Sequence, residues 1–191
     1  MKYFFIEPKY FVRREIYIIP EKNIWTPNIC HKCGGNFANT SVPLTVKIKG
    51  KPCDFYENSG KLLISSICLD IFKRLNLTGY SILPAEVIFS DKVDVPDGLK
   101  YYELIIDGRC GYAKDIHGNE LPKCDVCGRR FPQKEKVYGF SFDNEDYDGS
   151  SIFAFNNLYN FPIVSQDLKK QLTKEKLSNM KFTDISELET L

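Results

Sequence analysis

The pattern Cys-x-x-Cys-Gly occurs twice in the chain, as Cys30-His31-Lys32-Cys33-Gly34 and as Cys124-Asp125-Val126-Cys127-Gly128. Two thiolates at that spacing can reach one metal ion from a tight turn. The glycine that follows has no Cβ to crowd the backbone as it curls toward the sulfur atoms. Two such turns supply four sulfur ligands, the number that a tetrahedral structural zinc requires. We therefore predict a structural zinc site built from Cys30, Cys33, Cys124 and Cys127.

Other interpretations of these cysteines stay open. Because the two turns are far apart in the sequence, a shared site has to be closed by tertiary folding, and the pattern does not say whether both turns hold one ion. Iron in a rubredoxin-like sulfur cage uses the same ligands as zinc. A thioredoxin-like redox dithiol is usually a single motif in a βαβ unit, and this sequence has two motifs and no such unit.

Residues for catalysis are not apparent in the sequence. The chain has two histidines, His31 and His117, and no nucleophile is visibly paired with either. It has no glycine-rich phosphate loop, no His-Glu-x-x-His and no nucleophile elbow. A metal with four cysteine ligands has no open position for a substrate. We therefore expect a binding protein and not an enzyme.

An acidic stretch follows the second cysteine turn, with carboxylates at Asp143, Glu145, Asp146 and Asp148. It has the first half of a calcium loop, but the twelfth position, where a bidentate Glu is required, is Phe155. A solvated loop or an acidic surface for a basic partner fits the stretch better. In the second case the aromatic residues Tyr147, Phe153 and Phe155 are the expected apolar anchors of the interface.

Composition narrows the class of protein. The 191 residues carry a formal charge of +1, which gives no general attraction to nucleic acid or anionic lipid. The seven cysteines are an odd number, which argues against a secreted disulfide framework and for a reducing compartment, the cytoplasm. The apolar start of the chain is interrupted at Glu7, too early for a signal peptide, and we expect no membrane segment.

The helices and strands expected around the cysteines indicate an α+β fold with mostly antiparallel strands. Two short helices are expected, capped by Ser65 and Ser165. The first should bury Ile67, Ile71, Phe72 and Leu75 on one face. Alternating or continuous apolar runs predict strands over 2–6, 10–19, 42–48, 61–64, 101–106 and 137–142. Extended backbone is expected over 80–84 and 87–89, and 152–155 and 161–164 are apolar segments.

The order of these elements suggests an internal duplication within one domain, 1–191. Each half, 1–92 and 93–191, has a cysteine turn, then strands, then an apolar pair followed by a serine. A capped helix, a polar break and an extended exit come next in both halves. A duplication in which each half contributes one cysteine turn would explain a shared zinc-ribbon-like site, even though the two turns are far apart in the sequence.

The paired cysteine pattern resembles the double-CXXCG family of bacterial proteins. The C-terminal stretch, with Ser165, a lysine-rich helix and then Met180-Lys181-Phe182-Thr183, is similar to an ending common in that family and in immunity proteins of polymorphic toxin systems. The resemblance covers the two turns and the last ~30 residues. It implies a cytoplasmic immunity protein that binds and neutralises a cognate protein toxin. It gives neither the identity of the toxin nor the contact residues, and the oligomeric state stays unknown.

The alternative is a zinc-ribbon protein associated with nucleic acid. That function requires a basic face that can neutralise phosphates. The balanced charge and the acidic stretch argue against it.

Overall fold

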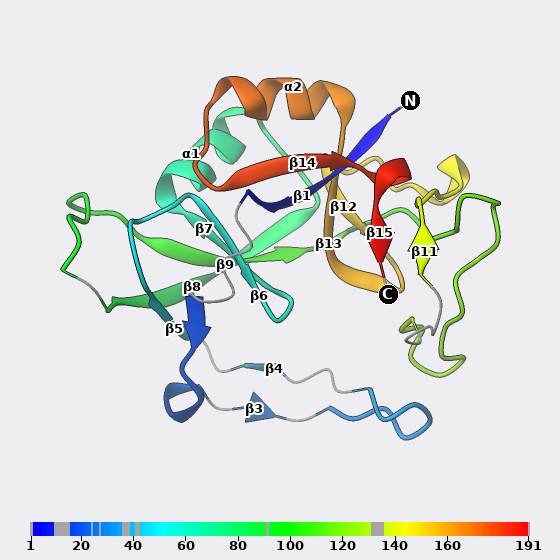
Figure 1. Cartoon of the computed structure of the whole chain (residues 1–191), viewed down its shortest axis with the longest axis horizontal. Helices are drawn as coiled ribbons and strands as arrows, with labels where there is room; N and C mark the ends of the chain where they lie inside the picture. The colour runs from blue at the N-terminus through cyan, green and yellow to red at the C-terminus, as the bar shows by residue number, and fades with distance from the viewer. Residues whose placement is uncertain are drawn as a thin grey trace.

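The computed structural model describes residues 2–9, 16–23, 25–26, 28–35, 39–40, 43–90, 92–130 and 136–190. Two β-sheets dominate these residues, with two helices on one side of the molecule (Figure 1). The helices are α1 (Ser66–Arg74) and α2 (Gln166–Lys174), and three short 3-10 helices cover Pro20–Lys22, Asn144–Asp146 and Ile185–Glu187. The α+β class and the mostly antiparallel pairing confirm the prediction.

The first sheet has five strands in the order β10-β12-β13-β1-β14. All its neighbouring strands are antiparallel except β10 and β12. Its strands are β1 (Tyr3–Pro8), β10 (Gly108–Arg109), β12 (Ile152–Phe155), β13 (Leu158–Ser165) and β14 (Met180–Asp184).

The second sheet has six strands in the order β2-β5-β8-β9-β7-β6, with β5 and β8 parallel. Its strands are β2 (Ile16–Ile18), β5 (Leu44–Ile48), β6 (Phe55–Asn58), β7 (Lys61–Ser65), β8 (Tyr80–Phe89) and β9 (Tyr101–Ile106). Two further pairs join β3 (Trp25–Thr26) to β4 (Asn39–Thr40) and β11 (Val137–Tyr138) to β15 (Glu189–Thr190).

The two helices have the same local design at positions one hundred residues apart. Ser65 Oγ accepts a hydrogen bond from Cys68 N at 3.1 Å, and Ser165 Oγ accepts one from Leu168 N at 3.3 Å. These bonds satisfy backbone donors that have no partner inside the helix, as serine caps do. Each helix follows a hairpin, β6–β7 or β12–β13, and precedes a strand, β8 or β14. Both predicted caps are confirmed.

The strand register repeats in the same way, but the third strand comes from the opposite half of the chain. Tyr101 of β9 pairs with Ser65, and Tyr3 of β1 pairs with Ser165. On their other sides, β9 pairs with β8 and β1 pairs with β14. Each hairpin-helix-strand unit therefore takes in an N-terminal strand that belongs to the other half of the sequence.

A core shared by both halves holds the helices against the sheets. It includes Cys68 and Phe72 of α1 together with Leu168 and Leu172 of α2. Outside the core, Arg74 of α1 forms an ion pair of 2.7 Å with Glu175, just beyond α2.

The prediction that Ile67 faces the core is wrong, because its side chain is 51% exposed. In the first turn of α1 the neighbouring Cys68 points inward and is fully buried.

The strand predictions differ from the structure at several ends. Of 10–19, only Ile16–Ile18 is a described strand, and residues 10–15 lie outside the described residues. Strand β5 begins at Leu44, and Val42 also lies outside them. The predicted strand 137–142 is wrong beyond Tyr138, because Gly139 takes a φ of +66° that ends the extended backbone.

Candidate metal centre

The first cysteine turn is closed by two backbone hydrogen bonds. Gly34 N donates to Cys30 O at 2.9 Å, and Cys30 N donates to Gly35 O at 2.9 Å. Gly34 has a φ of +68°, a left-handed conformation that favours glycine. The turn therefore directs both cysteine side chains to one side.

The second turn repeats this geometry with different residues between the cysteines. Gly128 N donates to Cys124 O at 2.8 Å, and Cys124 N donates to Arg129 O at 2.8 Å. Gly128 has a φ of +71°. The local pattern Cys-x-x-Cys-Gly thus folds the same way in both places, independently of the surrounding elements.

Tertiary folding brings the two turns together. The Sγ atoms of Cys30, Cys33, Cys124 and Cys127 all lie within 4.8 Å of one another. The distance is 3.9 Å from Cys30 Sγ to Cys124 Sγ and 3.6 Å from Cys33 Sγ to Cys127 Sγ. A tetrahedron with metal–sulfur bonds of about 2.3 Å has edges of about 3.8 Å. The four predicted ligands therefore meet at distances compatible with one bound metal ion.

The surroundings of the sulfur atoms shift the pKa values of Cys30 and Cys127 in opposite directions. A hydrogen bond from the backbone of Cys33 stabilises the thiolate of Cys30 and lowers its pKa to about 6. Burial raises the pKa of Cys127 to about 12, because the neutral thiol is easier to remove from water. Four sulfur atoms at this spacing cannot all be thiolates without a cation between them, and a divalent metal ion is one cation that fits this requirement.

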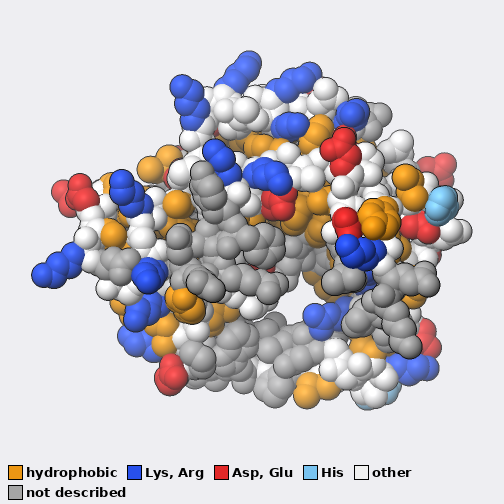
Figure 2. Space-filling view, in the orientation of Figure 1, with side chains coloured by type: hydrophobic (Ala, Val, Ile, Leu, Met, Phe, Trp, Pro, Cys, Tyr) orange, Lys and Arg blue, Asp and Glu red, His pale blue; other side chains and the backbone are white. Residues whose placement is uncertain are grey.

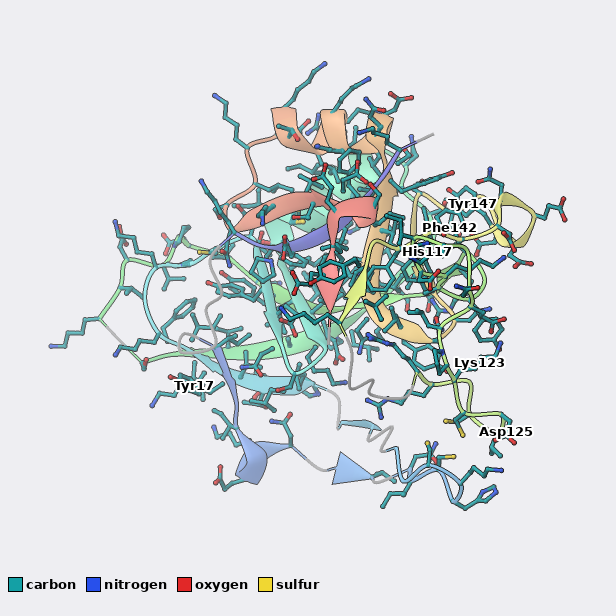
Figure 3. The ribbon with its side chains drawn as sticks, turned by 45° about the vertical axis from the view of Figure 1, so that its right-hand side comes forward. Tyr17, His117, Lys123, Asp125, Phe142 and Tyr147 are labelled. Carbon is teal, nitrogen blue, oxygen red and sulfur yellow. The ribbon has the colours of Figure 1, made fainter. Side chains whose placement is uncertain are left out.

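Contacts outside the four ligands also join the turns. Lys32 Nζ lies 3.2 Å from Asp125 Oδ2, so the variable residues of one turn form an ion pair with those of the other. Tyr159 Oη donates to Cys127 O at 2.9 Å, which ties the second turn to β13. Figure 3 shows Asp125 beside the clustered sulfur atoms.

Sequence analysis missed the contribution of these three residues. Lys32 and Asp125 have opposite charges at neighbouring positions of the repeated pattern, which could have suggested the ion pair. For Tyr159 the sequence holds no comparable signal, because its contact depends on how β13 passes the turn.

The remaining cysteines and histidines do not join this centre. Cys68 and Cys110 are fully buried in other parts of the core, and burial raises the pKa of both thiols. His31 is exposed in the first turn. His117 is also exposed, and Figure 3 shows it well apart from Asp125.

The four carboxylates of the acidic stretch are exposed, two of them have contacts within the chain, and the role of the stretch as a contact surface stays a prediction. Asp143 forms an ion pair with Lys114, and Asp148 accepts hydrogen bonds from Arg109 N at 2.7 Å and Ser150 N at 2.9 Å. These carboxylates hold their own loop in shape. The prediction that Phe153 and Phe155 anchor a partner is wrong, because both side chains are fully buried in an aromatic cluster.

No known family model matches this chain, and no curated protein matches its sequence. Within the described residues, no helix is both long enough and apolar enough to span a membrane.

Proposed function

We propose that Cys30, Cys33, Cys124 and Cys127 bind one zinc ion and that this zinc is structural. The supporting observation is the cluster of four sulfur atoms with edge distances of 3.6 and 3.9 Å, close to those of a zinc–sulfur tetrahedron. All four positions of the ion are then filled by protein. The zinc clamps residues 28–35 onto the second half of the chain.

Metal analysis of protein purified without a chelator tests this proposal. One zinc per chain is expected. Iron in place of zinc would replace the metal assignment and leave the four-ligand geometry intact, because both metals accept four thiolates. Two ions per chain, or none with all thiols reduced, would contradict a shared site.

We infer that the chain is an internal duplication with exchanged N-terminal strands. The equivalent caps and the equivalent registers of β1 and β9 support this inference. Fragments 1–92 and 93–191 then each lack the third strand of their own unit. Each fragment alone should be unfolded by circular dichroism, and the two expressed together with zinc should form one folded complex. A fragment that folds alone would contradict the exchange.

The zinc-stabilised protein, we propose, is an immunity protein that neutralises a bacterial toxin by binding it without catalysis. The resemblance of its cysteine pattern and C-terminal stretch supports this function. Apolar side chains beside the metal centre provide a place for contact, since Ile29 is 61% exposed and Val126 is 51% exposed. Both residues adjoin a turn cysteine in the sequence, and we propose that the toxin contacts them.

Co-expression with a toxin encoded next to this chain tests the proposal. Cells should survive with the wild-type protein, and Val126→Lys should weaken the complex. The matched control is Ile67→Lys, because Ile67 is equally exposed but lies on α1. Survival without any complex at micromolar concentration would show that binding is not the mechanism. Binding of nucleic acid in place of a toxin would favour the zinc-ribbon alternative.

A further inference from the structure

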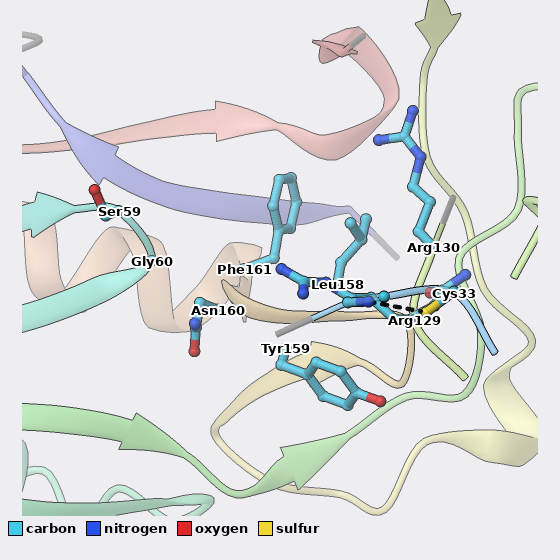
Figure 4. A pocket seen from close by; sticks show the side chains of 12 residues that line it. Cys33, Ser59, Gly60, Arg129, Arg130, Leu158, Tyr159, Asn160 and Phe161 are labelled. Atoms are coloured by element: carbon cyan, nitrogen blue, oxygen red, sulfur yellow. Dashed lines mark hydrogen bonds between the residues drawn. The ribbon is translucent and has the colours of Figure 1, made fainter. Parts of the chain in front are cut away.

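A cavity of about 620 Å³ lies next to the metal centre, between the two halves of the chain. Figure 4 shows it with Ser59 and Gly60 at one end and Cys33 and Arg129 at the other, and with β13 running along it. Figure 2 shows the same face hollowed near its centre, with Lys or Arg side chains on one border. This volume falls within the range of about 300–1,000 Å³ that is typical of small-molecule sites.

The polar groups of the cavity are mostly hydrogen-bond donors. Two guanidinium side chains, Arg129 and Arg130, line it together with the amides of Asn157 and Asn160 and the hydroxyl of Ser59. None of the described residues that line it is an aspartate or a glutamate. The cavity is therefore electropositive and suited to an anion.

Asn157 gives the clearest indication of a missing acceptor. Its side chain is only 1% exposed, and its Oδ1 accepts a hydrogen bond from Ala113 N at 3.0 Å. That bond determines which end of the amide is oxygen, because a backbone N–H requires an acceptor. The other end, Nδ2, is a buried donor with no hydrogen-bond partner in the described part of the chain. A buried donor without a partner is unfavourable, so an acceptor atom bound in the cavity would stabilise it.

Two glycines allow the walls of the cavity to approach each other. A Cβ on Gly60 would lie 2.9 Å from Asn160 Nδ2, and a Cβ on Gly35 would lie 3.3 Å from Arg129 Nη1. Gly60 also has a φ of +78°. Because these two glycines have no side chain, the donor groups of Asn160 and Arg129 can occupy positions that an added Cβ would crowd.

We propose that this cavity binds a small organic phosphate. A guanidinium donates two parallel hydrogen bonds to phosphate oxygens, and a phosphate has enough acceptor oxygens to reach Asn157 as well. Leu158, Tyr159 and Phe161 supply an apolar wall for the organic part of the ligand. This binding goes beyond the proposed zinc and toxin functions and does not depend on the latter.

Isothermal titration calorimetry of the zinc-loaded protein tests the proposal. The probes are adenosine 5′-monophosphate, pyrophosphate and inorganic phosphate, with adenosine and citrate as counterparts that carry no phosphate. We expect at least one phosphate probe to bind at a ratio of one per chain, and adenosine and citrate to bind at least about tenfold more weakly.

Two substitutions place the ligand in the cavity. Asn157→Asp keeps the acceptor for Ala113 N but replaces the unpaired amide donor with a carboxylate oxygen. Asn160→Asp replaces an amide donor of the cavity wall with a carboxylate oxygen at an exposed position, where folding is not at risk. Each should lower the affinity at least about tenfold, because a carboxylate repels a phosphate. The control, Lys73→Gln, removes one positive charge from the exposed face of α1 and should leave the affinity unchanged.

Three results would overturn the proposal. The first is that none of the phosphate probes binds at about 1 mM to protein whose zinc content is complete. The second is that adenosine or citrate binds as tightly as the phosphate probes. The third is that Asn160→Asp and Lys73→Gln have equal effects, which would show attraction by net charge without a built site. Because zinc content is measured on the same samples, loss of the metal centre is distinguished from loss of the ligand site.

Discussion

The substitution Cys124→Ser removes one of the four clustered cysteines that we propose as zinc ligands, and its effect can be estimated from the structure. Cys124 is buried and lies 3.9 Å from Cys30 across the two turns. Structural zinc contributes about 10–16 kcal/mol of apparent binding free energy in small domains, or about 2.5–4 kcal/mol for each of four ligands. That is a large part of the total stability of about 5–15 kcal/mol of a typical domain. At about 2–4 °C per kcal/mol for a chain of this size, we expect the melting temperature to fall by about 5–16 °C.

The assay combines zinc analysis with thermal unfolding followed by circular dichroism. The matched control is Cys53→Ser, because Cys53 is half-buried and lies outside the cluster of metal ligands. Cys53→Ser should keep one zinc per chain and most of its stability. A chelator should lower the melting temperature of all three proteins, and least that of Cys124→Ser, whose zinc has one ligand fewer. Equal melting temperatures for the two variants, or a wild type that is insensitive to chelators, would refute a structural metal.

Three further predictions concern the fold. Ser65→Ala and Ser165→Ala should each lower the free energy of unfolding by about 1 kcal/mol, measured in urea, because each removes a helix cap; no change in either would contradict the capping role. Gly79→Ala should lower the free energy of unfolding by more than about 2 kcal/mol, since the added Cβ would lie 2.1 Å from a backbone oxygen of β12. Gly98→Ala has open space around the added Cβ and should lower the free energy of unfolding by about 1 kcal/mol. Burial opposes ionisation of Asp184, but hydrogen bonds from a serine and an ion pair with a lysine keep its pKa below the ordinary value. The contribution of ionised Asp184 to the free energy of unfolding is therefore complete above the ordinary carboxyl pKa of about 3.9. It is lost as the pH falls through the lower pKa of the native state. The stability difference between the wild type and Asp184→Asn should shrink from about pH 7 to about pH 3, and a difference that grows would contradict this sign.

The sequence by itself determined the parts of the site that depend on neighbouring residues. The Cys-x-x-Cys-Gly turns follow from the spacing of the cysteines and from the left-handed conformation of Gly34 and Gly128. The helix caps at Ser65 and Ser165 follow in the same way, because a serine before an apolar run can satisfy the first free N–H groups. These features need only a few consecutive residues, so local chemistry was enough to predict them.

Predictions from neighbouring residues are wrong where the burial of a side chain depends on what its segment packs against. The aromatic residues Phe153 and Phe155 follow an acidic loop and are the expected anchors if that loop is a contact surface, yet β12 places them in the core. Along the sequence an apolar residue in a core and one in an interface look alike, because both bury the same kind of surface.

Only the tertiary structure decided that the two turns share one site. Cys30 and Cys124 are separated by 94 positions, and no local preference acts over that distance. The pairing of β1 with β13 and of β9 with β7 could not be predicted either, since strand periodicity indicates which face is buried but not which strand is the partner. The cavity with Arg129 and Asn157 arises from the same packing of one half on the other. Partners distant in sequence are chosen by the burial and hydrogen bonding of the whole chain, and that choice brings the four cysteines of this protein together.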